Sequence, residues 1–265
     1  MKLGLGQIKT TWFSINENKE SCIRLIKEAK NKSCTLIAFP EMTLTGFSSD
    51  ISAIENFITF EETLSFFKKA AEENSIYIGF GAVEKMGAKN FNSYIIISPK
   101  GLIANKYYKI HPFSPGKEDV MISPGDNISF SVIDNIVLSS FICYDLRFPE
   151  IFQIASKKSQ LLLVASAWPQ SRRDHWLTLL KARAIENQCF VAGVNSYGYD
   201  LSNQYYSGDS IIVSPLGETL SLTSEREDLI TAEISSSLVK STRAGFNVNK
   251  DRKNSTYLKY YKQFI

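Results

Sequence analysis

Three side chains that could do chemistry stand beside short apolar runs of the sequence. Glu41 directly follows "LIAFP", Cys143 ends "VLSSFIC", and Lys109 lies in "NKYYKIHPF" among aromatic and apolar neighbours. A thiol is a nucleophile, a carboxylate can carry a proton, and an ammonium can stabilise developing negative charge. Because the ends of buried strands often present reactive groups, these three residues are the first candidates for a functional site.

Each of the three also has a structural interpretation. A cysteine at the end of an apolar run is commonly a small buried hydrophobe, which is the favoured interpretation of Cys143 taken alone. Glu41 after a proline is compatible with a surface turn, and Lys109 is compatible with a side chain whose ammonium extends to solvent. No single residue decides between the two interpretations.

The elements that would position these residues are short strands. Nine apolar runs of strand length are bounded by Gly, Pro, Asn or Ser, the pattern of buried strands: "KLGLGQI", "CTLIAFP", "IYIGFGAV", "SYIIISP", "IVLSSFIC", "LLLVASAW", "CFVAGVN", "SIIVSP" and "DLITAEI". The turns "SPKG" and "SPLG" predict a further short strand after two of them.

Helical patterns lie between the runs, over 16–31, 61–74 and 173–188. The third carries Trp176, Leu180 and Ala184 on one stripe with more apolar residues beside it, which predicts burial on more than one side, including against a partner subunit. Without a linker or a shift in composition, residues 1–265 are predicted to form one α/β domain with helices outside the strands.

Composition excludes several classes of protein. The chain is 44% apolar and 22% charged with a net charge of +3, and its Lys- and Arg-containing C-terminal segment lacks a basic helical stripe, so we expect no nucleic-acid partner. Four cysteines without a CxxC spacing and only two histidines argue against a metal site or a disulfide framework. With no cofactor motif, signal peptide or membrane-length apolar run, a cytoplasmic protein is expected.

The three contexts together resemble the carbon–nitrogen hydrolase (nitrilase) superfamily. "FPEMTLTGF" is similar to its glutamate motif, "YYKIHPF" to its lysine motif and "CYDLRFPE" to its cysteine motif, in the same order and spacing. The resemblance continues through "KARAIENQ" and "YYSGDSIIVSPLGE" and so covers most of the chain.

The resemblance implies a Glu–Lys–Cys triad that hydrolyses an amide through a thioester. Glu41 would be the general base for the Cys143 thiol, and Lys109 with the backbone N–H of Tyr144 would face the oxyanion. Glu118 matches a further glutamate of the family that orients the lysine or the substrate. The charged run Lys117–Asp119 is equally compatible with a solvated loop.

Within the superfamily, "SAWPQSRRDHWLTLLKARAIENQ" and "YSGDS" are most similar to the bacterial ω-amidase branch, which deaminates 2-oxoglutaramate and 2-oxosuccinamate. A substrate with a free carboxylate needs a cation, for which Arg172 and Arg173 are the candidates, with Trp168 as an apolar wall. One of the two arginines is also compatible with an exposed residue that caps the next helix. Arg147 and Glu150 are interpreted as a structural ion pair or helix-start residues.

The fold implied is a four-layer α-β-β-α sandwich. Family members pair through helices near the cysteine, which predicts a homodimer or a larger homo-oligomer, with the tail from about residue 240 at the interface.

Other interpretations stay open. Another amidase of the superfamily, acting on an N-carbamoyl amino acid or deaminated glutathione, would keep the triad and change the pocket. A non-catalytic binding protein on the same fold would have lost a triad residue. A Cys–His enzyme would use His111, although local packing is the favoured interpretation for this residue, as it is for His175.

Overall fold

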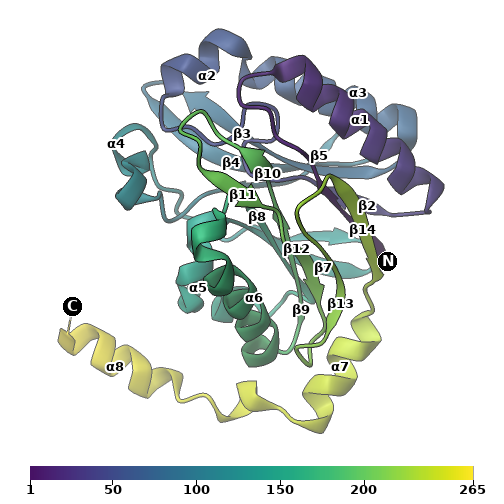
Figure 1. Ribbon diagram of the computed structural model, residues 1–265. Coiled ribbons are helices and arrows are strands. Elements are labelled where there is room, and N and C mark those ends of the chain that lie inside the picture. Colours follow the sequence, from purple (N-terminus) through teal and green to yellow (C-terminus); the bar gives the residue numbers. More distant parts are fainter. Residues whose placement is uncertain (265) are drawn as a thin grey trace.

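The computed structural model describes residues 1–264 of the chain of 265. Two six-stranded sheets lie face to face, and helices cover the outer face of each sheet (Figure 1). This arrangement confirms the predicted four-layer α-β-β-α sandwich. None of the helices in the described range is both long enough and apolar enough to cross a membrane.

The first sheet has the strand order β14-β1-β2-β3-β4-β5. Its three central neighbours β1, β2 and β3 are parallel, while β14, β4 and β5 pair antiparallel to the strands beside them. Its strands are β1 (Lys2–Gln7), β2 (Leu36–Ala38), β3 (Tyr77–Met86), β4 (Lys89–Ile97), β5 (Ile103–Tyr108) and β14 (Asp228–Glu233).

The second sheet has the order β13-β12-β9-β8-β7-β6, with β7, β8 and β9 parallel. Its strands are β6 (Ser131–Ile133), β7 (Ile136–Ile142), β8 (Leu161–Ser166), β9 (Phe190–Asn195), β12 (Ser210–Val213) and β13 (Thr219–Thr223). A separate antiparallel ribbon joins β10 (Tyr197–Tyr199) to β11 (Tyr205–Ser207). All nine predicted runs contain a strand, and β5 and β13 are the strands predicted after the two turns.

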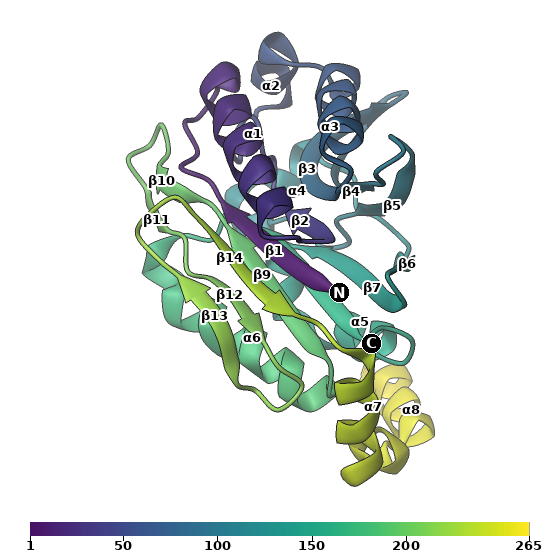
Figure 2. The same ribbon diagram turned by 90° about the vertical axis from the view of Figure 1, so that its right-hand side faces the viewer.

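Two helices cover each sheet. The first sheet carries α1 (Ile15–Asn31) and α3 (Phe60–Asn74), and the second carries α5 (Pro149–Ala155) and α6 (Arg173–Asn187), as Figure 2 shows from the side. The shorter helices α2 (Ile51–Phe57) and α4 (Glu118–Met121) lie at the rim. The described residues also include four 3-10 turns: Ser114–Gly116, Cys143–Arg147, Gln170–Arg172 and Val248–Asp251.

The core explains why the strands are apolar along their whole length. The larger cluster contains residues of both sheets together with α5 and α6, including Leu5 and Ile96 from the first sheet and Leu163 from the second. A second cluster packs α1 and α3 against the opposite face of the first sheet. Each sheet is therefore buried on both faces, which removes the polar–apolar alternation of a half-exposed strand.

The C-terminal segment departs from the sandwich. Helix α7 (Ser236–Gly245) buries Val239, whereas α8 (Asn254–Phe264) has no buried residue. Figures 1 and 2 show α7 and α8 extending beyond the end of the two sheets, on the side of α5 and α6.

Candidate active site

Glu41 lies in the turn after β2, with its side chain fully buried. Its Oε1 accepts hydrogen bonds from Asn92 Nδ2 at 2.7 Å and Lys109 Nζ at 2.8 Å, and its Oε2 accepts from the backbone N–H of Ala167 at 3.0 Å. The carboxylate is thus held by three donors from two different sheets. The alternative of a surface turn residue is wrong, because the side chain has no exposure.

Lys109 directly follows β5 and is also fully buried. Its Nζ donates to Glu41 Oε1 and to Glu118 Oε2, each at 2.8 Å. Burial alone would lower the pKa of this ammonium, but the two carboxylates outweigh it and hold the pKa of Lys109 above its ordinary value. Lys109 therefore stays charged between the two glutamates and does not extend to solvent.

Glu118, the first residue of α4, is buried as well. Its Oε1 accepts from Asn92 Nδ2 at 2.8 Å, and its Oε2 accepts from the backbone N–H of Phe113 at 2.6 Å in addition to Lys109. The alternative of a solvated loop is wrong for Glu118, although its neighbours Lys117 and Asp119 are exposed. Two carboxylates and one ammonium share this buried cluster.

Cys143 follows β7 at the start of a 3-10 turn. Its φ of 47° lies in the left-handed region, which is strained for a residue with a Cβ, as at other sites where a turn presents a reactive group. The thiol donates to the carbonyl oxygen of Ala167 at 3.9 Å. Burial raises the pKa of the Cys143 thiol and the nearby Glu41 carboxylate raises it further, so the resting residue is a neutral thiol.

Asp145 fixes the turn that carries Cys143. The buried carboxylate accepts from the backbone N–H of Ile142 at 3.0 Å and from the hydroxyl of Tyr107 at 2.7 Å. It also lies 2.8 Å from His111 Nδ1, and the His111 ring stacks on Phe148 at 3.7 Å between centroids. His111 therefore pairs with Asp145, as expected for local packing, and joins the lysine segment to the cysteine turn.

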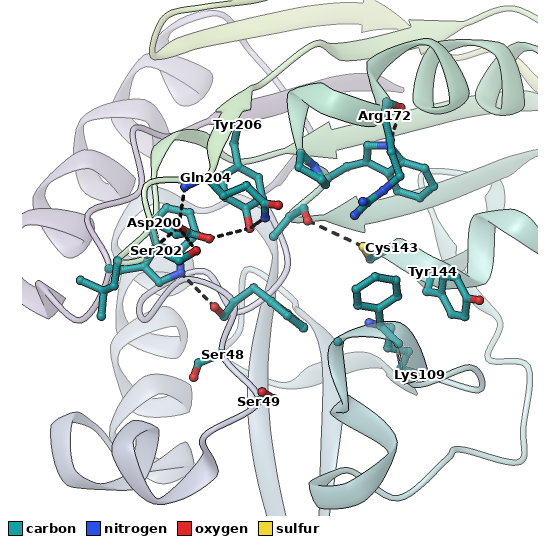
Figure 3. Close-up of a pocket in the computed structure, with 18 of the residues that line it drawn as sticks. Ser48, Ser49, Lys109, Cys143, Tyr144, Arg172, Asp200, Ser202, Gln204 and Tyr206 are labelled. Carbon is teal, nitrogen blue, oxygen red and sulfur yellow. Dashed lines mark hydrogen bonds between the residues drawn. The ribbon is translucent and has the colours of Figure 1, made fainter.

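The reactive residues open onto a cavity of about 480 Å³. Cys143, Lys109 and Tyr144 line one end, and Figure 3 shows them at the same side of the cavity as Arg172. Aromatic side chains form much of the wall: Trp12, Phe13, Phe47, Phe113, Trp168 and Tyr206. Polar side chains from two loops complete it: Ser48, Ser49, Asp200, Ser202 and Gln204.

Arginines distinguish this cavity from a purely apolar one. Arg172 lies over the Phe113 ring with its guanidinium carbon 5.6 Å from the centroid, and Arg147 lies over Trp168 at 4.7 Å. Both arginines line the cavity, and neither makes an ion pair with a carboxylate of residues 1–264. Trp168 is buried in the wall, as predicted, and its indole N–H donates to the Arg172 carbonyl oxygen at 2.7 Å.

Arg173 differs from its neighbour. Its guanidinium donates to the buried Asp209 at 2.8 Å, and Arg173 is not among the residues that line the cavity. The prediction that it binds substrate is corrected, because this ion pair directs its side chain elsewhere. Of the two interpretations of Arg147 and Glu150, the ion pair is wrong, since Arg147 lies 3.3 Å from His175 Nδ1 and Glu150 accepts from the Tyr261 hydroxyl. The other is confirmed for Glu150, which lies in the first turn of α5.

The arrangement can perform nucleophilic chemistry on a carbonyl compound. A thiol, a buried carboxylate and a buried ammonium come together at the end of a cavity that also presents cationic groups. Sequence reasoning missed Asn92, which donates to both glutamates, and the loop at 200–204. Asn92 has no local signal, because its position depends on strand pairing: Lys109 N–H donates to the Asn92 carbonyl oxygen at 2.9 Å. The loop at 200–204 is placed by the pairing of β10 with β11.

Comparison with known proteins agrees with the geometry. The family model described as "Carbon-nitrogen hydrolase" matches residues 2–244. A "2-oxoglutaramate amidase" of Bacillus subtilis is 33% identical over 211 residues, which cover 78% of this chain and 80% of that protein. A "Hydrolase in agr operon" of Staphylococcus aureus is 29% identical over 261 residues, covering 97% of this chain and all of the relative.

Among solved structures, a protein of Xanthomonas campestris described as a CN-hydrolase superfamily member with an arsenic adduct in its active site superposes with a TM-score of 0.88. It is 28% identical and covers 96% of this chain and 97% of its own.

Proposed function

The chain belongs to the carbon–nitrogen hydrolase family, and we propose that it hydrolyses the ω-amide of a 2-oxo dicarboxylate, such as 2-oxoglutaramate or 2-oxosuccinamate, and releases ammonia. The observation that carries the proposal is the buried Glu41–Lys109–Glu118 cluster, which meets Cys143 at the end of a cavity. The cavity is also lined by two arginines that make no ion pair with a carboxylate of residues 1–264. The Bacillus subtilis relative named 2-oxoglutaramate amidase supports this choice of substrate.

The first half of the reaction forms the thioester. Glu41 removes the thiol proton as Cys143 Sγ attacks the amide carbon, and the carbonyl π electrons move to the oxygen. Lys109 and the backbone N–H of Tyr144 face this oxyanion. The carbonyl then re-forms, the C–N bond breaks, and the proton held on Glu41 moves to the departing nitrogen, so that ammonia leaves.

The second half hydrolyses the thioester. A water molecule gives a proton to Glu41 and attacks the acyl carbon, forming a second oxyanion in the same place. The carbon–sulfur bond then breaks, and Glu41 returns the proton to the sulfur. Because burial and Glu41 raise the pKa of the Cys143 thiol, the sulfur needs a base beside it to take its proton, which is the role proposed for Glu41.

Recognition of the substrate carboxylate is assigned to Arg172. Its guanidinium is half-buried, lines the cavity and lacks an acidic partner within residues 1–264, so a bound carboxylate would supply the missing ion pair. Arg147, whose guanidinium lies over the Trp168 ring, is a second donor within the same cavity. The aromatic wall would cover the short methylene chain of the substrate.

The test is ammonia release by the purified protein from 2-oxoglutaramate and 2-oxosuccinamate, measured beside glutamine, an N-carbamoyl amino acid and deaminated glutathione. Release from the two oxo-amides alone supports the proposal. Preferential release from either of the last two substrates would replace the substrate assignment and keep the triad. The cavity of about 480 Å³ leaves room for these larger amides, which is why they belong in the panel.

We also propose that the protein acts as a homodimer in the cytoplasm. Helix α8 exposes Leu258 and Phe264, and Ile154 of α5 and Ile185 of α6 are more than half exposed. Helix α8 extends on the side of the molecule that carries α5 and α6 (Figure 1). A second copy would cover this apolar surface. Four free cysteines suit a reducing compartment.

Sedimentation of the protein tests the dimer. Leu258→Glu should shift the protein toward monomer, whereas Leu102→Glu, in the exposed turn before β5, should leave its mass unchanged. A wild-type protein that sediments as a monomer would contradict the assembly without affecting the proposed reaction.

A further inference from the structure

Ser166, the last residue of β8, is buried without a hydrogen-bond partner. Its side chain has no exposure, and its Oγ makes no hydrogen bond within residues 1–264. A buried hydroxyl without a partner costs free energy, so such groups are uncommon and call for an explanation.

The pairing of β7 with β8 brings this hydroxyl to the nucleophile. The two strands are parallel, with Ile142 opposite Ala165, which places Cys143, the first residue after β7, beside Ser166, the last residue of β8. The thiol donates to the carbonyl oxygen of Ala167, the residue after Ser166. Burial and then the Glu41 carboxylate raise the pKa of the Cys143 thiol, whereas the Lys109 ammonium and then the Ser166 hydroxyl lower it.

The other polar groups around the sulfur have different tasks. Ala167 presents a carbonyl oxygen, which cannot donate to a sulfur that has lost its proton. Lys109 donates to Glu41 and Glu118, and both oxygens of Glu41 already accept hydrogen bonds. A sulfur that gains negative charge during proton removal therefore needs a further donor, and a free hydroxyl lies beside it.

We propose that Ser166 is an additional catalytic residue whose hydroxyl donates a hydrogen bond to Cys143 Sγ while the sulfur carries negative charge. This occurs when Glu41 takes the thiol proton, and again when the thioester breaks and the sulfur leaves. The proposal rests on the proposed function only in that Cys143 is the nucleophile; it does not depend on which amide is the substrate.

The test measures the reactivity of the sulfur directly. The rate at which iodoacetamide alkylates Cys143 is followed by mass spectrometry of the peptide that contains this residue, at about pH 8, below the pKa of an ordinary thiol. Ser166→Ala should slow alkylation about tenfold, the effect of removing one hydrogen bond to a charged group. Ser166→Thr, which keeps the hydroxyl, should restore most of the rate.

Ser140 provides a matched control. It lies on β7, three positions before Cys143, and its hydroxyl is also fully buried without a partner within residues 1–264. Ser140→Ala should alkylate at the wild-type rate. Equal slowing in both alanine variants would show that the effect comes from altered packing of the core, and would overturn the proposal. Thermal melting of each variant shows whether it is folded.

The outcomes separate this inference from the proposed function. A folded Ser166→Ala protein that alkylates as fast as the wild type overturns the role of Ser166, whatever amide is hydrolysed. A tenfold slowing in a protein that releases no ammonia from any tested amide supports the role and contradicts only the substrate assignment. With an accepted amide, kcat should fall for Ser166→Ala while KM stays unchanged.

Discussion

Glu41 and Cys143 meet at the main chain of one residue, Ala167. The Ala167 N–H donates to Glu41 Oε2 at 3.0 Å, and its carbonyl oxygen accepts from the Cys143 thiol at 3.9 Å. The carboxylate comes from the first sheet and the thiol from the second, so the end of β8 aligns the proposed base with the proposed nucleophile.

Replacing the nucleophile tests the centre of the mechanism. Cys143→Ala should lower ammonia release by at least about 10³-fold, because no thioester can form without the sulfur. The melting temperature should change little, since the thiol makes a single long contact with the Ala167 carbonyl. Comparable turnover by the alanine variant would remove Cys143 from the reaction.

Glu118 should matter through the charge that it gives to the cluster. Glu118→Gln keeps the size of the side chain but puts a neutral amide beside Lys109, so we expect kcat to fall about 10²-fold with the fold intact. Glu84→Gln is the control, because Glu84 pairs with Lys106 at 2.7 Å away from the cavity lining. Steady-state kinetics that showed equal losses in both variants would contradict a specific role for Glu118.

The adjacent arginines should separate substrate binding from stability. Arg172→Met should raise KM for 2-oxoglutaramate about 10- to 100-fold through loss of a charge-assisted contact, and leave KM for a neutral amide such as propionamide unchanged. Arg173→Met removes the partner of the buried Asp209, so it should lower the melting temperature with little effect on KM. The reverse pattern would exchange the assignments of the two arginines.

Buried thiols should lower the stability of the folded protein in alkaline solution. Burial raises the pKa of Cys189 from 9.0 to about 12. The contribution of this group to stability is therefore complete below about pH 9, where unfolded thiols are protonated, and is lost as pH rises toward the folded value. The urea unfolding free energy should fall between these limits by about 1.4 kcal/mol per pH unit for each such group.

The comparison variant for this prediction is Cys189→Ala. It should unfold with a shallower pH dependence than the wild type, whatever its stability at neutral pH. Curves with the same slope for both proteins would show that another group is responsible.

Arg243 should contribute strongly to stability. From α7 it donates to the carbonyl oxygens of Ser156, Ser159, Asn187 and Gln188 at 3.0–3.2 Å, at the C-terminal ends of α5 and α6. Arg243→Met should cost about 2–3 kcal/mol in chemical denaturation, because it leaves several carbonyl oxygens without a donor. Arg226→Met, which removes an exposed pair with Asp228, should cost less than about 1 kcal/mol.

Much of the sandwich could be predicted because strands buried on both faces have a strong local signal. Glu41, Lys109 and Cys143 were selected as candidates because each stands beside an apolar run, and the resemblance of their contexts to the carbon–nitrogen hydrolase motifs joined them into a candidate triad. The three-residue strands β6, β10 and β11 were not predicted, because their pairing depends on distant partners rather than on their own composition.

The remaining site residues were harder to predict from the sequence, because their positions also depend on distant partners. Asn92 lies within β4, and only the pairing of β4 with β5 turns it toward the two glutamates. The two arginines are consecutive in sequence, so nothing local distinguishes the one that lines the cavity from the one held by Asp209. Arg147 was interpreted as part of an ion pair or as a helix-start residue, and the structure instead shows it in contact with His175.

The division of the site between two sheets bears on how the protein becomes active. Lys109 and Glu41 belong to the first sheet, Cys143 to the second, and the hydrogen bond from Tyr107 to Asp145 joins the two. The first sheet is complete only when β14, near the end of the sandwich, pairs with β1. During refolding, ammonia release would therefore appear only when the two sheets have docked. In a partly synthesised chain that lacks β14, the Cys143 thiol would be present but would not catalyse the reaction.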